Sequence, residues 1–192
     1  MFRLDRGPVC AAMFAAVLSF AAFGQGKLPP GMTMHRLQAG TLDPSGWTLA
    51  ESTRGAFAVK LPCAFNDFMV DDDTGADVSR VHVVGCMRPD REKYSATRLQ
   101  YRGSGKARSY FEKNMDPAAL SGARKTRTEY HGLPAIDIAM PEQRGCAAMR
   151  FILVEPEIVM MVAEAPAEQC MRLRSQVPVF FSSLKIQKTD AK

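Results

Sequence analysis

The sequence predicts an α+β fold, in which helices pack on the faces of a mostly antiparallel β-sheet as an α/β/α sandwich. Short apolar runs with the composition of strands, separated by turn residues, account for most of the chain. Only two longer segments, at 106–115 and 166–184, place apolar residues at helical spacing. Several strands, then a helix, more strands and a final helix are typical of this class and not of a parallel sheet.

The apolar stretch at residues 149–163 predicts the middle of that sheet. Two runs rich in Ile, Val and Phe flank Glu155-Pro156-Glu157, which favours two strands joined by a tight turn. Apolar residues fall on both faces of each run, so we expect this hairpin to be covered on both sides. The C-terminal helix is the expected cover on one face, and the segment 106–120 is the expected cover on the other.

Alternation and turn residues define the strands before the first helix. Phe57, Val59 and Leu61 share one face of a strand that Pro62 ends. The predicted strands are 47–51, 55–62, 78–87 and 94–101, the last two forming a hairpin with its turn at 88–91. Two stretches lack a period: we expect 27–45 to be a linker or loosely ordered entry segment and 63–70 to be irregular.

The second half of the chain alternates between helices and strands. Residues 106–115 predict a surface helix, and Asp116-Pro117 resembles the cap of a short second helix. The last helix begins at Pro166, and Pro178 is expected to bend or split it. The remaining expectations are the short helix at 118–120, strands at 126–130, 133–140 and 184–186, a loop at 141–145 and a polar tail at 188–192. We assign residues 46–187 to a single domain, because the chain has 192 residues of ordinary globular composition.

The N-terminal residues 1–26 have the layout of a secretory signal peptide. A basic start with Arg3 and Arg6 precedes the apolar, small-residue run 9–23, which is too short for a membrane span. The alternative is an uncleaved N-terminal anchor. No later segment reaches the length of a span, so we expect a periplasmic or secreted protein without a membrane span after signal removal.

Cysteine usage supports export. Once Cys10 leaves with the signal, Cys63, Cys86, Cys146 and Cys170 remain, and an even number favours disulfides in an exported protein. Of the three possible pairings we favour Cys63–Cys86 and Cys146–Cys170, because each joins neighbouring elements; the alternative is free buried thiols. The spacing contains no C-x-x-C, which argues against a zinc site or a redox motif.

Three motifs point to ligands, and each is incomplete. Residues 103–106 (G-S-G-K) lack the first glycine and the hydroxyl residue of a phosphate-binding loop. Residues 71–77 (D-D-D-T-G-A-D) place acidic groups together, but the glycine and the distal glutamate of a calcium loop are not in position. Residues 32–35 (M-T-M-H) offer thioethers and an imidazole, ligands that suit copper. We expect a turn, a solvated acidic loop and core or surface side chains instead.

No complete catalytic constellation is recognisable. The chain has three histidines, His35, His82 and His131, and neither a G-x-S-x-G nor an H-E-x-x-H motif. His82 lies in a predicted strand and His131 in a His-Gly turn, so both favour structural roles. With a formal net charge of +5, the chain is mildly basic, and export makes nucleic acid an improbable partner.

Three short motifs together resemble small exported bacterial domains of the PsbP-like type. They are the strand at 55–62 (G-A-F-A-V-K-L-P), Glu164-Ala165-Pro166 after the central hairpin, and the closing 179–186 (V-F-F-S-S-L-K-I). The resemblance covers about residues 47–187. It implies an antiparallel sheet sandwiched by helices and a non-enzymatic role, often as an accessory to a larger assembly. No functional residue of that family maps onto a position of this sequence.

The sequence therefore favours an exported, non-catalytic binding or accessory domain, with an envelope protein or another ligand as its partner and no cofactor or metal. Two alternatives remain. One is a small envelope hydrolase that uses His82 or His131. The other is a carrier that holds an apolar ligand between sheet and helix.

Overall fold

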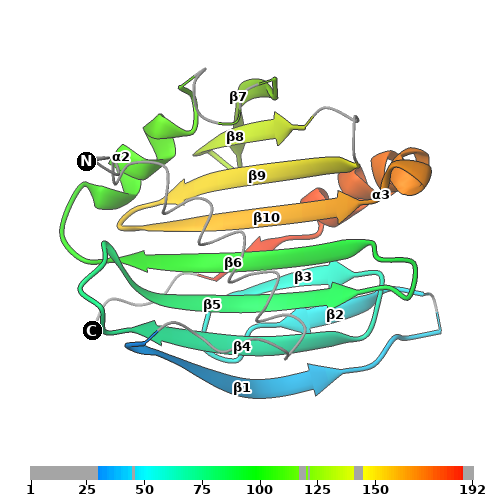
Figure 1. Ribbon diagram of the computed structural model, residues 1–192, viewed down its shortest axis with the longest axis horizontal. Coiled ribbons are helices and arrows are strands. Elements are labelled where there is room, and N and C mark those ends of the chain that lie inside the picture. Colours follow the sequence, from blue (N-terminus) through cyan, green and yellow to red (C-terminus); the bar gives the residue numbers. More distant parts are fainter. Residues whose placement is uncertain (1–29, 45, 117–119, 121, 141–144, 188–192) are drawn as a thin grey trace, which may run out of the picture.

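The structure is a computed structural model that describes residues 30–44, 46–116, 120, 122–140 and 145–187. An eight-stranded antiparallel sheet, in the order β1-β4-β5-β6-β10-β9-β8-β7, dominates it, and a three-stranded sheet, β11-β3-β2, lies behind (Figure 1). The predicted α+β class is confirmed. The strands are β1 Met32–Gly40, β2 Thr48–Glu51, β3 Phe57–Leu61, β4 Phe65–Asp72, β5 Val78–Met87, β6 Lys93–Tyr101, β7 Arg124–Tyr130, β8 Leu133–Ala139, β9 Cys146–Val154, β10 Glu157–Ala165 and β11 Lys185–Ile186.

Helices cover both faces of the large sheet. Helix α2 (Lys106–Lys113) packs on β6, β9 and β10 from one side, and α3 (Cys170–Ser182), preceded by the single turn η1 (Ala167–Gln169), packs on β9 and β10. The small sheet shares the face of α3, because side chains of β2, β3 and α3 belong to one apolar cluster and those of α2 to another. The domain is thus a three-layer sandwich with two separate cores.

The β9–β10 hairpin lies between these cores, as its two-faced apolar pattern predicted. Ile152, Val159 and Met161 face α3 and the small sheet, whereas Phe151 and Ile158 face α2, and all five are nearly inaccessible to solvent. Burying each such side chain contributes roughly 1.5–3 kcal/mol. Burial on both faces therefore stabilises this hairpin within the sheet.

Two predictions about the first part of the chain are wrong. The linker or loosely ordered segment expected at 27–45 contains β1, and the irregular stretch expected at 63–70 contains most of β4. Strand β1 lacks an alternating apolar pattern because both of its faces are largely exposed, and its order comes from the ladder with β4. In β4 a buried aspartate, Asp67, interrupts the apolar pattern.

Helix α3 runs without a break through Pro178. The sequence predicted a bend or split there, since an internal proline removes one backbone hydrogen bond. Pro178 is exposed, whereas Leu173, Phe180 and Phe181 anchor the helix on both sides of it. Apolar contacts therefore outweigh the lost bond.

The expectation of disulfide bonds is confirmed. Cys63 pairs with Cys86 and Cys146 with Cys170, each across a Cα–Cα distance of 5.7 Å, which are the pairings favoured by proximity along the chain. The second bond ties the start of β9 to the start of α3. Two disulfides are typical of an extracytoplasmic domain.

Some predictions fall on segments that the structure does not describe. These are the signal peptide at 1–26, most of the short helix at 118–120, the loop at 141–144 and the tail at 188–192. Within the described residues, no helix combines the length and the hydropathy that crossing a membrane requires.

Candidate functional site

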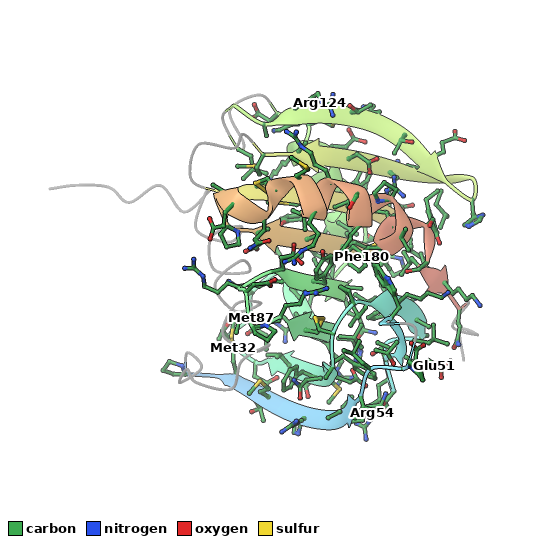
Figure 2. The ribbon with its side chains drawn as sticks, turned by 90° about the vertical axis from the view of Figure 1, so that its right-hand side faces the viewer. Met32, Glu51, Arg54, Met87, Arg124 and Phe180 are labelled. Carbon is green, nitrogen blue, oxygen red and sulfur yellow. A yellow bond between two sulfur atoms is a disulfide. The ribbon has the colours of Figure 1, made fainter. Side chains whose placement is uncertain are left out.

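An open groove of about 450 Å³ separates α3 from the outer strands β7, β8 and β9. Helix α3 packs over β9 and β10, so β7 and β8 extend beyond it, and Figure 2 shows Arg124 on the outer strand past the helix. The groove is lined mainly by apolar side chains with two arginines, from the residues Arg124, Ala139, Ala148, Arg150, Val177 and Phe181. Mostly apolar walls with a few polar groups are usual for ligand sites. We call this feature the α3 groove.

Alanines make the floor of the α3 groove. The strand register places Arg124 opposite Ala139, Ala139 opposite Ala148, and Ala148 opposite Ala163. Directly opposed residues point to the same face of a sheet, so three neighbouring strands present methyl groups in one row. Because these side chains are short, they leave space between the sheet and the solvent beside α3. Ala139 and Ala148 are half-buried.

One ion pair crosses the adjacent row of the floor. Arg150 donates from Nε and Nη2 to the two carboxylate oxygens of Asp137, at 2.7 and 2.8 Å. The guanidinium carbon also lies 4.7 Å from the ring centroid of Phe181 on α3. A bidentate ion pair and a cation–π contact together fix the arginine in one orientation. The wall under the helix therefore carries a preorganised polar group.

Arg124 stands at the outer rim of the groove. Its side chain is exposed, and it has no side-chain partner among the described residues. Asp137, the one carboxylate among the described lining residues, is already held by Arg150. The rim is therefore cationic, while the floor is apolar. This combination suits a ligand with an apolar body and an anionic group.

The two histidines singled out from the sequence do not share a site. His82 lies on β5, and His131 lies in the turn between β7 and β8; strands β6, β10, β9 and β8 separate β5 from β7. His131 is exposed, with its ring 4.5 Å from that of Tyr130. Neither histidine lines the α3 groove.

His82 is buried and lacks the surroundings of a general base. Burial first, and then the neighbouring charges of Arg80 and Arg98, lower its pKa to about 4. Only 2% of the residue is exposed, and its Nδ1 has no hydrogen-bond partner within the described part of the chain. A catalytic base needs access to a substrate and a partner that orients its ring.

A buried polar cluster holds the loop between β2 and β3 over His82. The carboxylate of Asp67 accepts from Ser52 Oγ at 3.2 Å and from the backbone N–H of Thr53 at 2.7 Å. Arg98 donates to the carbonyl of Gly55 at 3.0 Å. These bonds explain why the sequence tolerates a fully buried aspartate in β4.

Ser52, Asp67 and His82 lie close together, but they are not connected as a catalytic triad. A Cβ on Gly55 would lie 2.5 Å from Ser52 Oγ and 2.9 Å from His82 Cβ, so serine and histidine both pack under this glycine. In a triad the imidazole stands between hydroxyl and carboxylate. Here the hydroxyl bonds the carboxylate directly, so the cluster has a structural role.

The acidic stretch 71–77 does not converge on a common point. Asp71 binds Arg80 at 2.6 Å, Asp72 accepts from the backbone N–H of Thr74 at 2.7 Å, and Asp77 pairs with Lys106 at 3.1 Å. Each of these carboxylates has a protein partner of its own. The G-S-G-K stretch serves as the turn into α2, where Gly105 has a φ of 73°.

Strand geometry separates the soft ligands at 32–35. Met32, Thr33, Met34 and His35 are consecutive in β1, and side chains alternate between the two faces of a strand. The two thioethers therefore point away from the imidazole, whose Nε2 lies 3.6 Å from Asp71 Oδ2. In the part of the chain that the structure describes, no group of three or more His, Cys, Asp or Glu side chains is placed to hold a metal ion.

A second polar cluster fixes α3 to the β5–β6 hairpin. The carboxylate of Glu92, which is completely buried, accepts from Arg172 Nε at 2.7 Å. Arg172 also bonds Asp90, and Tyr94 donates to Gln176 at 2.6 Å. Burial and the charge of Glu92 raise the pKa of Tyr94 well above its ordinary value. All of these groups are satisfied internally, which indicates a structural role.

The residues of the α3 groove were not recognised as a site from the sequence. Their signal is weak: Ala139, Ala148 and Ala163 are small residues of β8, β9 and β10, and β7 contains basic residues. Register across strands that are distant in sequence brings them together, and no local motif records it. The carrier hypothesis placed a ligand between sheet and helix without naming residues, and it stays a prediction.

Comparisons with known proteins show similarity of fold. No family model matches the chain, and no curated protein matches it. The solution structure of cyanobacterial PsbP (CyanoP) from Synechocystis sp. PCC 6803 is similar over 85% of this chain and 99% of that chain, at 10% identity and a TM-score of 0.47. This likeness to a PsbP-like protein, at low identity, is one of fold.

Two further solved structures are similar. Protein PA94 of unknown function from Pseudomonas aeruginosa shares 17% identity over 74% of this chain and 99% of that chain, with a TM-score of 0.42. LpqN, described as involved in cell envelope biogenesis of Mycobacterium tuberculosis, shares 11% identity over 82% of this chain and 92% of that chain, with a TM-score of 0.38.

Proposed function

We propose that this chain is an extracytoplasmic, non-catalytic binding or accessory domain whose ligand site is the α3 groove. The two disulfides support an oxidising compartment, for which we propose the periplasm. Export by residues 1–26 and a single domain that ends near residue 187 belong to the same proposal. We place the ligand site in the α3 groove because its volume of about 450 Å³ falls within the size range of ligand sites.

The proposed ligand has an apolar body and an anionic end. The body lies on the alanine floor beside Val177 and Phe181. The anionic end lies near Arg124, which has no side-chain partner among the described residues. This deepens the carrier interpretation, since the space between sheet and helix is both apolar and cationic at its rim.

A hydrolase that uses His82 or His131 has less support. His82 is covered by the β2–β3 loop, and His131 is exposed in a turn far from the groove. Among the residues that the structure describes, neither imidazole hydrogen-bonds to a hydroxyl, thiol or carboxylate that would give it a catalytic partner. We therefore place the function in binding.

Titration calorimetry with decanoate tests the site. The probe combines a carboxylate with an alkyl chain, and we expect a dissociation constant on the order of 10–100 µM. Ala148→Leu fills the floor and abolishes the heat, whereas Arg124→Gln weakens binding about 10-fold through loss of a charged contact. Lys106→Gln, which removes a cation from α2, is the matched control and leaves binding unchanged.

Two results would contradict this site. One is that decanoate produces no heat up to about 1 mM, and the other is that it binds Ala148→Leu as tightly as the unmodified protein. Thermal unfolding of each variant shows that the fold is retained. Mass spectrometry of solvent extracts from the purified protein then identifies any natural amphiphile.

A further inference from the structure

Among the residues that the structure describes, no strand pairs with the outer side of β7, the last strand of the large sheet. It ends the strand order, and most of its residues are exposed or half-buried. The turn to β8 has two residues, His131 and Gly132, so the flanking pair Tyr130 and Leu133 exchanges backbone hydrogen bonds. By alternation, the backbone N–H and C=O groups of Lys125, Arg127 and Glu129 point away from β8. These groups form a regular row of donors and acceptors.

We propose that β7 pairs with β7 of a second copy of this chain, antiparallel and with Arg127 on the two-fold axis. This register sets outward-facing residues against outward-facing residues, as a hydrogen-bonded ladder requires. Lys125 then lies opposite the partner's Glu129, and Glu129 lies opposite the partner's Lys125. An isologous contact repeats each favourable pair, so both ends of the interface carry an ion pair.

The remaining contacts of this register are also compatible. Arg127 faces its own copy, but each Arg127 binds Glu112 of α2 at 2.5 Å, so the axis carries two cations and two anions. On the other face, Thr126 lies opposite the partner's Thr128. The ammonium of Lys125 donates to the carbonyl of Asp116 at 2.5 Å, which holds this side chain on the same face of β7 as Arg127.

The other open edge of the large sheet lacks this complementarity. Strand β1 contains His35 and Arg36 but no Asp or Glu, and its register with β4 shifts between Arg36 and Gln38. Antiparallel pairing of two β1 strands would bring no opposite charges together. Lysines on an edge strand usually prevent pairing, but in β7 each lysine meets a glutamate.

Pairing through β7 changes the α3 groove. Arg124 and Thr126 line the outer side of that groove, and the partner's β7 continues the sheet beyond them. Two grooves then face each other across the axis, each closed on its outer side by the second copy. The dimer stands independently of the ligand proposed above, since its evidence is the edge geometry and the charge pattern of β7.

Sedimentation velocity of the exported, naturally processed protein tests the dimer. A single strand pair is a small interface, so we expect monomer and dimer to exchange over about 1–200 µM. Lys125→Glu alone and Glu129→Lys alone each put like charges opposite one another and weaken the dimer at least about 10-fold. Arg127→Pro removes an outward N–H without touching the β7–β8 ladder, and it abolishes the dimer.

Mixing gives the sharpest control. The Lys125→Glu and Glu129→Lys proteins can form both ion pairs only with each other. An equimolar mixture of the two should therefore regain the affinity that each variant loses alone. Arg80→Glu, on β5, leaves association unchanged. A wild-type protein that stays monomeric at 200 µM, or a dimer that both reversals leave intact, would overturn the proposal. A monomer that instead captures an extended peptide along β7 would also overturn it.

Discussion

At the residue scale, His82 makes stability depend on pH. Its folded-state pKa is lowered to about 4 from 6.5, chiefly by burial. The unfolded chain therefore binds the proton more tightly, so the contribution of His82 to stability is complete above pH 6.5 and is lost as the pH falls toward 4. Of the charged groups near it, Arg80, Arg98 and Arg54 oppose protonation and Asp71 favours it.

We expect the free energy of unfolding to fall by about 2 kcal/mol between pH 8 and pH 5 through His82 alone. Urea denaturation at a series of pH values measures the total change. His82→Gln retains a polar side chain without a titrating group, so its stability should vary less over this range by that amount. Identical pH profiles for the two proteins would contradict a buried neutral histidine.

Glu92 is the residue whose loss should weaken α3 most. Its carboxylate is fully buried and accepts from Arg172, which is itself half-buried. Glu92→Gln should therefore lower the free energy of unfolding by about 1.5–3 kcal/mol, as for the loss of a charged hydrogen bond. Glu168→Gln removes an exposed partner of Arg91 and should change stability by less than about 0.5 kcal/mol. Equal effects of the two substitutions would argue against this cluster.

Buried polar residues explain what the sequence could not indicate at this scale. Asp67 and Glu92 are charged residues that ordinarily mark the surface, and both are fully buried here. Their partners, Ser52, Thr53 and Arg172, come from other elements. Burial of such groups follows from the tertiary fold and leaves no local pattern.

At the scale of elements, strands with at least one continuous apolar face could be predicted from the sequence. Strands β1 and β4 could not. Alternation reveals a strand only when one face is buried. Strand β1 exposes both faces and is ordered by its ladder with β4, and β4 carries Asp67 at a buried position. The central hairpin was predictable because its position between two cores requires apolar residues on both faces.

The Cys146–Cys170 disulfide should matter more for binding than Cys63–Cys86. It ties α3 to β9, and both of these elements border the α3 groove. The double replacement of Cys146 and Cys170 by Ala should lower stability by about 3 kcal/mol. It should also weaken decanoate binding, measured by calorimetry under conditions where the protein stays folded.

Replacing Cys63 and Cys86 by Ala is the matched control for that experiment. The two bonds span similar chain separations, 23 and 24 residues, so their entropic effects on the unfolded chain are similar. Only the Cys146–Cys170 bond borders the groove. Equal losses of binding in the two double variants would contradict a site next to α3.

At the scale of the whole molecule, the fold class and the disulfide bonds were predictable from the sequence, whereas the candidate site was not. Periodicity and cysteine spacing are local along the chain, and they identified the sheet, the helices and the covered hairpin. The α3 groove depends on how far β7 and β8 extend beyond the helix. That distance is set by strand order, which no stretch of this sequence encodes by itself.

Export is testable on the intact protein. The exported form should lack residues 1–26 and should be about 4 Da lighter than its fully reduced form, because two disulfides replace four thiols. Mass spectrometry before and after reduction measures both properties at once. An unprocessed chain, or four alkylatable thiols without reduction, would contradict an extracytoplasmic location.

Amide chemical-shift mapping tests directly whether the α3 groove is the binding surface. Titration of ¹⁵N-labelled protein with decanoate should shift the resonances of Ala139, Ala148, Arg150 and Val177, which line the groove. The resonances of β1 and of the turn at 103–106 should stay in place. Shifts confined to the opposite face around α2, or no shifts at saturating probe, would contradict the account.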